Sequence, residues 1–254
     1  MSADSRALLS LRGVSKRFGG VTALSDVSLD VAQDEILGII GPNGAGKTTL
    51  LNCVSGVNRV DSGEISFAGR SLRGLGPHRV ARLGIGRTFQ VVKPFGSMTV
   101  RENAAVGALF GSSQARLATR EAFVQADETL ELVGLGSKRS LPVASLTVPD
   151  RKRLEVARAL CTRPRLLLLD EVMAGLNAVE VDDALAMARD VHARGVTIVL
   201  IEHVMRVIVG ICHRVIVLHL GRHLAEGRPE EVLKDGRVIE AYLGEKYAQR
   251  HAHG

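Results

Sequence analysis

The stretch GPNGAGKTT at residues 41–49 decides the fold, because it matches the pattern G-x-x-x-x-G-K-[ST] between the two elements that this pattern requires. The apolar run EILGII at residues 35–40 precedes it and predicts a strand that is covered on both faces. The segment KTTLLNCVSG at residues 47–56 follows it and predicts an apolar helix. A strand, a glycine-rich turn and a helix in this order predict a phosphate-binding loop. The alternative is a glycine-rich turn that binds nothing.

The residue types of this loop suit a triphosphate. Glycines take backbone conformations that are closed to other residues and so bring N–H groups onto phosphate oxygens, while the N-terminus of the helix adds partial positive charge. We expect Lys47 to reach the β and γ phosphates and Thr48 to be a ligand of Mg²⁺. The expected nucleotide-binding residues of the loop are Gly41, Pro42, Asn43, Gly44, Ala45, Gly46, Lys47, Thr48 and Thr49.

A second half of the site is predicted by RLLLLDE at residues 165–171, a buried strand that ends in two carboxylates. We expect Asp170 to hold the magnesium shell, as the aspartate at this strand end does in P-loop enzymes. Adjacent strand residues point to opposite faces, so Glu171 is expected to polarise a water against the γ-phosphate. The alternative is a pair of solvated carboxylates at a strand end.

Two single residues are weaker candidates. His203 ends the strand-like segment TIVLIEH at residues 197–203 and is a candidate donor that senses the terminal phosphate. Gln90 closes GIGRTFQ at residues 84–90, where its amide can serve both as a ligand of Mg²⁺ and as a partner of the attacking water. Without the other motifs, each is more simply an ordinary core or surface residue.

The rest of the chain predicts an α/β fold. Residues 7–18 and 21–31 alternate as strands of an antiparallel sheet would, and residues 91–160 are helix-periodic with few strand signals. Strand-like runs return at residues 165–170 and 197–203 around a helical segment at residues 178–195, which predicts a parallel sheet. Residues 214–227 predict a hairpin with Gly221 in its turn.

Composition bounds the class of protein without naming it. The 254 residues carry a net charge of +6, which fits an anionic ligand, membrane surface or nucleic acid. The segment at residues 207–220 is interrupted by His213 and Arg214 and falls short of the roughly 18 apolar residues that a membrane-spanning helix needs. Residues 1–10 are not typical of a secretory signal, so a cytosolic location is expected. We expect buried, reduced thiols at Cys53, Cys161 and Cys212.

Taken in order, GPNGAGKTT, Gln90, RLLLLDE, AGLN (174–177) and IEH (201–203) resemble the nucleotide-binding subunits of ABC transporters. FGGVTAL (18–24), the run at 74–90, MTVRENAAVG (98–107) and AYLGE (241–245) are similar to the branched-chain amino-acid importer ATPases. The resemblance implies one domain over residues 1–254: a P-loop NTPase core with a mainly parallel sheet, an N-terminal antiparallel β subdomain and an α-helical subdomain inserted at about residues 91–160.

The same resemblance implies roles and partners. Phe18 would stack on the adenine of ATP, with a core phenylalanine as the alternative, and Gln90 would couple the site to membrane permease subunits. Residues 174–177 would form the loop between two paired ATPase subunits. The chain would act at the cytoplasmic face of the membrane with ATP and Mg²⁺, and indirectly with a solute-binding protein outside the cell.

The family's LSGGQ-like loop, which reaches the ATP of the opposite subunit, falls on LTVPD at residues 146–150. Thr147 keeps a hydroxyl, but Val148 and Pro149 replace residues that donate backbone N–H groups, and Asp150 adds a charge expected to repel phosphate. The same residues also predict a helix cap, with Thr147 as N-cap and Pro149 in the first turn. A weak loop of this kind predicts a heterodimer with a related ATPase, which would supply an intact loop.

Other readings remain open from the sequence. The core motifs do not separate an importer from an exporter of lipid or polysaccharide, which is the alternative function. A nucleic-acid ATPase would need a long coiled coil that residues 48–169 do not contain, and a sensor that binds ATP without turnover is disfavoured by Glu171. The cluster at residues 151–153 is expected to be a solvated basic helix face, and RHAHG at residues 250–254 a frayed terminus.

Overall fold

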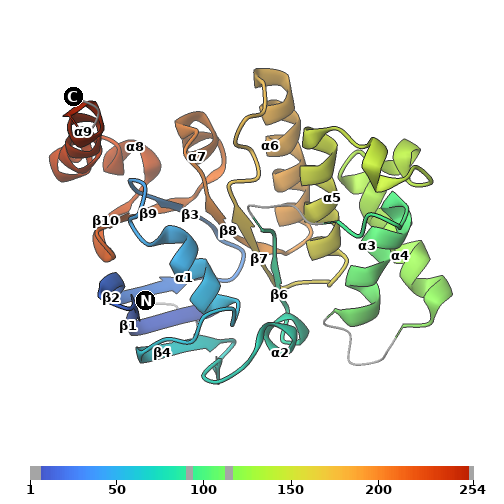
Figure 1. The fold of residues 1–254 in the computed structure, drawn as a ribbon, viewed down its shortest axis with the longest axis horizontal. Helices are drawn as coiled ribbons and strands as arrows, with labels where there is room; N and C mark the ends of the chain where they lie inside the picture. The colour runs from blue at the N-terminus through green and yellow to red at the C-terminus, as the bar shows by residue number, and fades with distance from the viewer. Residues whose placement is uncertain (1–6, 90–93, 112–116, 252–254) are drawn as a thin grey trace, which may run out of the picture. The chain divides into compact units, whose positions relative to one another are not determined.

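The computed structural model describes residues 7–89, 94–111 and 117–251 and divides the chain into two compact units. Unit 1 comprises Met1–Leu75 and Val199–Gly254, and unit 2 comprises Gly76–Ile198. Figure 1 shows the elements of both units, most of them labelled. Gln90 lies outside the described residues.

Unit 1 contains the antiparallel sheet expected from the N-terminal segments. Its strand order is β2-β1-β4-β5, formed by β1 (Leu9–Phe18), β2 (Val21–Val31), β4 (Ser62–Phe67) and β5 (Arg70–Ser71). The pairing of Leu11 with Leu29 on β2 and with Ile65 on β4 places three apolar side chains side by side, and all are buried. The alternation of apolar and polar residues thus gives one covered face.

The second sheet of unit 1 carries the strand that leads into the glycine-rich loop. β3 (Ile36–Ile40) is buried along its whole length and pairs in parallel with β9 (Arg214–His219), which pairs antiparallel with β10 (Arg222–Gly227). β8 (Thr197–Ile201) contributes residues 199–201 on the other side of β3. Helix α1 (Lys47–Val54) begins directly after the loop, as predicted.

The apolar segment at residues 207–220 is divided between two short elements rather than forming one long helix. Helix α7 (Met205–Ile211) ends at Cys212, and β9 starts two residues later. The β9–β10 hairpin turns at Leu220 and Gly221, which have φ values of 47° and 76°. Two successive positive φ values match the type I′ turn that suits the twist of a hairpin, so the predicted place of Gly221 is confirmed. Helices α8 (Pro229–Val232) and α9 (Gly236–His251) follow.

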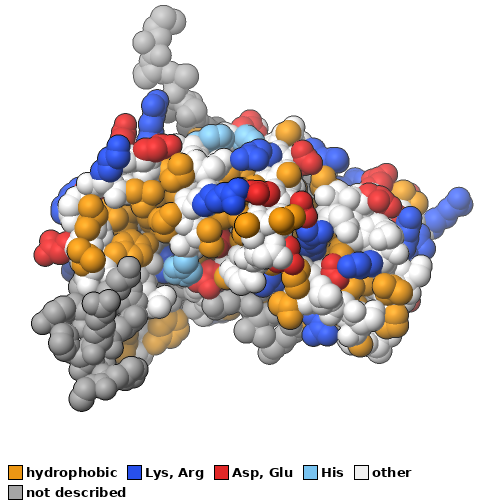
Figure 2. All heavy atoms as spheres, turned by 90° about the horizontal axis from the view of Figure 1, so that it is seen from above, with side chains coloured by type: hydrophobic (Ala, Val, Ile, Leu, Met, Phe, Trp, Pro, Cys, Tyr) orange, Lys and Arg blue, Asp and Glu red, His pale blue; other side chains and the backbone are white. Residues whose placement is uncertain are grey.

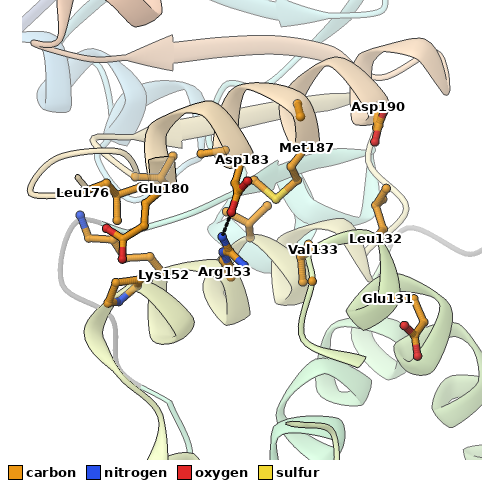
Figure 3. Close-up of a pocket in the computed structure, with 16 residues that line it drawn as sticks. Glu131, Leu132, Val133, Lys152, Arg153, Leu176, Glu180, Asp183, Met187 and Asp190 are labelled. Carbon is orange, nitrogen blue, oxygen red and sulfur yellow. Dashed lines mark hydrogen bonds and ion pairs between the residues drawn. The ribbon is translucent and has the colours of Figure 1, made fainter. Parts of the chain in front are cut away.

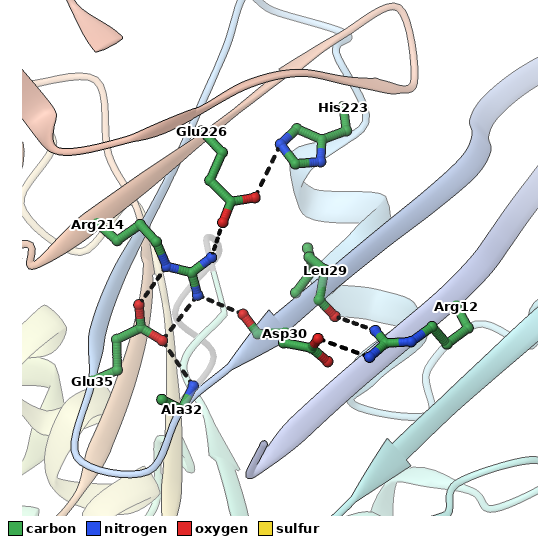
Figure 4. Close-up of polar contacts among 8 residues, drawn as sticks. All are labelled: Arg12, Leu29, Asp30, Ala32, Glu35, Arg214, His223 and Glu226. Atoms are coloured by element: carbon green, nitrogen blue, oxygen red, sulfur yellow. Dashed lines mark hydrogen bonds and ion pairs between the residues drawn. The ribbon is translucent and has the colours of Figure 1, made fainter. Parts of the chain in front are cut away.

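An ion-pair network centred on Arg214 joins the two sheets of unit 1 (Figure 4). Its guanidinium donates to both carboxylate oxygens of Glu35, at 2.7 and 3.0 Å, and to the carbonyl oxygen of Asp30 at 2.6 Å. It also bonds Glu226 on β10, whose other carboxylate oxygen lies 3.4 Å from His223 Nε2. One half-buried side chain therefore ties β9 to β2, to the turn before β3 and to β10.

Unit 2 contains a short parallel strand pair and most of the helices. β6 (Ile85–Arg87) pairs in parallel with β7 (Leu166–Asp170). The helices are α2 (Pro77–Arg82), α3 (Val100–Phe110), α4 (Thr119–Leu132), α5 (Val148–Leu160) and α6 (Ala178–Ala193), with 3₁₀ turns at Gly136–Lys138 and Val143–Ser145. Helix α3 packs against α4 and α5, and Gly107 allows the closest approach, because a Cβ there would lie 2.2 Å from the carbonyl oxygen of Arg158.

The observed architecture confirms the predicted α/β fold class, with a parallel sheet, an antiparallel sheet and helices. The organisation as one domain with an inserted subdomain remains a prediction.

All three cysteines are buried and free, as expected, and burial raises the pKa of Cys161 to about 11 and that of Cys212 to about 12. Among the helices within the described ranges, none has both the length and the apolar character needed to cross a bilayer.

Figure 2 shows one face of the molecule, on which Lys and Arg side chains are interspersed with Asp and Glu. The net charge of +6 is therefore not gathered into a single basic patch on this face. The basic side chains on this face therefore do not form the continuous positive surface that broad contact with a phosphate backbone uses.

Candidate functional site

The glycine-rich loop is shaped by close approaches that exclude side chains. Gly41, Gly44 and Gly46 have φ values of 147°, 73° and 101°, in the region that favours glycine. A Cβ on Gly41 would lie 2.0 Å from the carbonyl oxygen of Leu218, and one on Gly46 would lie 2.4 Å from that of Ala23. The loop is therefore a backbone cradle whose shape depends on glycine at these positions.

The side chain of Lys47 bonds the first residues of this cradle. Its Nζ donates hydrogen bonds to the carbonyl oxygens of Gly41 and Pro42, at 2.6 and 2.8 Å, and the residue is 6% exposed. Lys47 is also the first residue of α1, and Gly46 is its N-cap. The ammonium group and the helix N-terminus both place positive charge at the loop, which is the arrangement that binds phosphate.

Phe18 lies at the end of β1 in the same unit as the loop and is 48% exposed. Lys16 Nζ lies 5.3 Å from the centroid of its ring. The alternative that Phe18 is a core residue is therefore wrong. Its exposed ring has the character that stacking on a purine requires.

His203 is exposed and follows the C-terminal end of β8 by two residues, next to the buried Glu202. Residues 199–201 of β8 neighbour β3, the strand that leads into the cradle. Unit 1 thus contains the glycine-rich loop, Phe18 and His203.

Unit 2 contains the predicted carboxylate of the metal shell, and it is fixed from two sides. Asp170 is the last residue of β7 and is 1% exposed, and its Oδ2 accepts from Arg87 on β6 at 3.1 Å. The backbone N–H of Asp170 donates to the hydroxyl of Thr88 at 3.1 Å, while the N–H of Thr88 donates to the carbonyl oxygen of Leu168. Asp170 is therefore a buried, positioned carboxylate, and the alternative of a solvated group is wrong for it.

Glu171 differs from the expectation in its backbone. The strand ends at Asp170, and Glu171 has a φ of 53°, so the alternation of faces along a strand does not apply to it. A non-glycine residue in the left-handed region carries strain on the order of 1–3 kcal/mol, and such residues cluster at functional sites. The left-handed turn sets the direction in which the Glu171 carboxylate leaves the strand end.

Residues 146–150 form the helix entrance that the capping pattern predicts. Thr147 is the N-cap of α5, and its Oγ1 accepts from the backbone N–H of Asp150 at 3.3 Å. The same hydroxyl donates to Asp150 Oδ2 at 2.9 Å, and Lys138 Nζ lies 2.6 Å from that oxygen. The hydroxyl expected to be kept for a phosphate is thus bonded to a carboxylate of its own helix.

The charge of Asp150 is compensated rather than open to solvent, because the residue is 7% exposed and ion-paired. Burial opposes its ionisation, but Lys138 and the hydroxyl of Thr147 outweigh burial and hold the pKa of Asp150 below its usual value. The expected direct repulsion of phosphate by Asp150 is therefore weakened by Lys138.

The basic cluster at residues 151–153 is not the solvated face that the sequence predicts. Arg151 donates to the carbonyl oxygens of Leu146 and Ala144, and Lys152 donates to that of Ala174.

Arg153 pairs with Asp183 on α6 at 3.0 Å, in the wall of a cavity of about 290 Å³ (Figure 3). These side chains fasten α5 to the loop before it, to the loop after β7 and to α6.

Two residues of the site are missed by sequence reasoning. Arg87 stands three positions before Gln90 but matches no pattern that pairs it with Asp170, and Lys138 lies in a 3₁₀ turn that the sequence does not mark. The one available signal for Arg87 is its place near the end of a β-like run that stops just before the helical segment.

Comparisons with known proteins show the family of this chain. The model of the ABC transporter family matches residues 24–174, and that of the branched-chain amino acid ATP-binding cassette transporter matches residues 222–248. The "high-affinity branched-chain amino acid transport ATP-binding protein LivG" of Salmonella typhimurium is 41% identical over 95% of this chain and 99% of its own length. BraF of Pseudomonas aeruginosa, which has the same description, is 40% identical over 95% and 99%.

Solved structures give the same assignment. The ADP conformation of MJ1267, an ATP-binding cassette of an ABC transporter, superposes with a TM-score of 0.85 at 30% identity and covers 94% of this chain and 99% of that one. A nucleotide-free ATP-binding cassette from an ABC transporter gives 0.83 at 28% identity and covers 93% and 98%.

Proposed function

The chain belongs to the ABC transporter family of ATP-binding proteins and is an ATPase of that kind, and from this premise we propose that it energises the uptake of branched-chain amino acids or a similar small solute. The observation that carries the proposal is the 41% identity to LivG over 95% of the chain. The match of residues 222–248 to the branched-chain transporter model also supports the solute class.

In this proposal, the cradle of unit 1 binds the triphosphate of ATP. Backbone N–H groups of residues 41–49 contact the phosphate oxygens, and Lys47 moves its hydrogen bonds from the carbonyls of Gly41 and Pro42 to the β and γ phosphates. Phe18 stacks on the adenine.

Mg²⁺ is part of the same proposal, and the donor set suits it. Magnesium prefers hard oxygen ligands, and proteins bind it through one or two carboxylates together with substrate phosphates. Thr48 and Gln90 supply a hydroxyl and an amide oxygen, and Asp170 supplies a carboxylate fixed at its strand end. The metal would neutralise charge on the β and γ phosphates. Glu171 then polarises the attacking water, and His203 donates to the terminal phosphate.

The state of the Thr147 hydroxyl supports a heterodimer. Because Thr147 donates to Asp150 and Pro149 has no N–H, the loop at residues 146–150 offers few donors to an ATP on a second subunit. Two copies of this chain would place the weak loop at both ATP sites. We therefore propose pairing with a related ATPase whose loop retains its glycines.

The proposal places the heterodimer on permease subunits at the cytoplasmic face of the membrane. The helical segment that follows Gln90 in the sequence transmits opening and closing of the ATPase pair to the permease. A solute-binding protein outside the membrane then delivers the solute. The relatives' description as transport ATP-binding proteins supports a permease partner.

Reconstitution tests the transport function. The complex is purified through a tag on this chain, its subunits are identified by mass spectrometry, and it is placed in proteoliposomes with ATP on the side of the ATPase subunits. Radiolabelled leucine should then move toward the ATP side, and Lys47→Ala should abolish both transport and high-affinity nucleotide binding. Movement of a lipid or sugar away from that side would instead assign an exporter.

A second variant tests the asymmetry. Restoring glycine and glutamine in Val148→Gly/Pro149→Gly/Asp150→Gln should raise the ATPase rate of this chain alone by at least about tenfold, since one lost preorganised donor costs on the order of a hundredfold. Arg151→Gln serves as a control in the same turn. If the unaltered chain alone already hydrolyses ATP at the rate of the full complex, the heterodimer proposal is wrong.

A further inference from the structure

A buried ion pair holds Asp170 where the magnesium shell is proposed. Arg87 Nη2 and Asp170 Oδ2 lie 3.1 Å apart, and the two side chains are 5% and 1% exposed. A carboxylate removed from water at this depth is strongly disfavoured without a nearby cation. In the structure, Arg87 is a cation in direct contact with it.

Backbone structure fixes both partners of this pair. Arg87 is the last residue of β6, whose register sets it beside Leu168 of β7, and Asp170 ends β7 two residues later. The guanidinium lies 5.1 Å from the centroid of the Phe89 ring, while Thr88 accepts from the N–H of Asp170. The pair is therefore set by the parallel strands and is not a chance contact between flexible side chains.

A metal ion at Asp170 and the guanidinium of Arg87 would act on the same carboxylate. The metal ion and the guanidinium each reduce the negative potential of the carboxylate. They also repel each other across a few ångströms in a poorly solvated site. A metal bound to Asp170 would therefore weaken the ion pair with Arg87, and the ion pair would weaken the binding of metal.

We propose that Arg87 is a positioning residue that serves as the resident cation of Asp170 in the metal-free protein and opposes the binding of Mg²⁺. The inference rests on the proposed function, in which Asp170 belongs to the magnesium shell. Arg87 holds the carboxylate in place without metal and lowers its affinity for metal. Tight magnesium binding then requires the additional negative charge of the nucleotide phosphates.

The proposal predicts effects of different size on the stability of the metal-free and the magnesium-loaded protein. Removing the guanidinium takes away a cation that contacts Asp170, so the metal-free protein loses stability. The magnesium-loaded protein loses less, because the metal supplies positive charge to the same carboxylate. The stabilisation that Mg²⁺ gives should therefore be larger in a variant without Arg87 than in the unaltered protein.

The test uses Arg87→Met in the full chain, purified with its partner subunit. Binding of a fluorescent ATP analogue and the unfolding temperature are measured over a magnesium series. We expect the magnesium midpoint to fall by at least about tenfold, because the variant lacks the Coulomb repulsion between the guanidinium and the metal. Arg87→Lys keeps the charge and should stay near the unaltered midpoint, which also covers the case in which Arg87→Met folds poorly.

Arg101→Met is the control, at a more exposed pair whose side chains are 39% and 23% exposed. Arg101 also pairs with an aspartate, Asp127 at 2.6 Å, and its guanidinium also lies over an aromatic ring, 4.6 Å from the centroid of Phe123. This control should lower stability equally with and without Mg²⁺ and leave the midpoint unchanged. An unchanged or raised midpoint in Arg87→Met, or a shift of equal size in Arg101→Met, overturns the inference.

Asp170→Asn separates this inference from the proposed function. If nucleotide binding by Asp170→Asn keeps the magnesium dependence of the unaltered protein, the proposed metal role of Asp170 fails, and the inference fails with it. If Asp170→Asn loses that dependence while Arg87→Met keeps the unaltered midpoint, the inference about Arg87 alone fails.

Discussion

The hydroxyl of Thr147 donates to the carboxylate of Asp150 2.9 Å away, within residues 146–150 at the N-terminus of α5. Thr147 thus keeps the expected hydroxyl, but this hydroxyl donates to a carboxylate of the same chain. A loop can retain a side chain of the right type and still lose the interaction, because the hydrogen-bond partner decides where the proton points.

Asp150→Asn should lower the free energy of unfolding at pH 7 by about 1 kcal/mol, because it weakens an N-terminal cap and an ion pair. Lys138 and Thr147 hold the folded-state pKa of Asp150 below its unfolded value, so its contribution is present above that unfolded value and is lost as the pH falls through the folded one. The loss of stability below about pH 4 should therefore be shallower in Asp150→Asn.

Urea denaturation across a pH series measures this effect. Lys138→Met and the double variant complete a cycle in which the two changes should be less than additive, because they remove the same contact. Full additivity would mean that the ion pair contributes nothing.

Phe18→Ala should weaken nucleotide binding by about fivefold to a hundredfold, the range for loss of one base–aromatic stack. Stability should change little, since the ring is already 48% exposed. Fluorescence anisotropy with labelled ATP measures the affinity, and Phe18→Trp should retain it. Equal binding by Phe18→Ala would remove Phe18 from the site.

Glu171→Gln should retain ATP binding and lower the hydrolysis rate by about a hundredfold or more, because an amide cannot take the proton of the attacking water. A single-turnover assay on the heterodimer measures the step directly. Because Glu171 has a φ of 53°, Glu171→Gly is an informative companion: it should be folded as well as the parent yet equally inactive. Normal turnover in either variant would assign the base elsewhere.

Arg214→Met should destabilise the protein by about 2 kcal/mol, since it breaks a partly buried pair that joins four segments of unit 1. The side chain is 25% exposed, so solvent screening keeps the effect below that of a fully buried pair. Arg12→Met is the control, because its pair with Asp30 is exposed and should contribute about 1 kcal/mol or less. Thermal unfolding of both variants compares them.

The parts predicted from the sequence are those whose chemistry fixes their spacing. The cradle at residues 41–49 needs glycine for backbone approach, and the close contacts of Gly41 and Gly46 show the cause. The strands at residues 9–18 and 21–31 were predictable because one face is covered and side chains alternate with period two.

The parts that were missed depend on topology rather than on local pattern. Arg87 meets Asp170 because β6 and β7 are parallel neighbours, although the residues lie far apart in the sequence. Short elements such as α2 and β6 carry too few residues for a periodic signal. The end of helix α7 inside the apolar segment at residues 207–220 could not be predicted, because Cys212 and His213 are not typical turn residues.

The hydrogen bonds from Lys47 to Gly41 and Pro42 have a kinetic consequence. Lys47 already holds the loop in its curved conformation. A nucleotide that binds therefore replaces the hydrogen bonds of Lys47 and does not have to order the loop. Little conformational entropy remains to be lost at that moment. Association should accordingly proceed in one step whose rate depends on collision and charge, with no slow phase for closure of the loop.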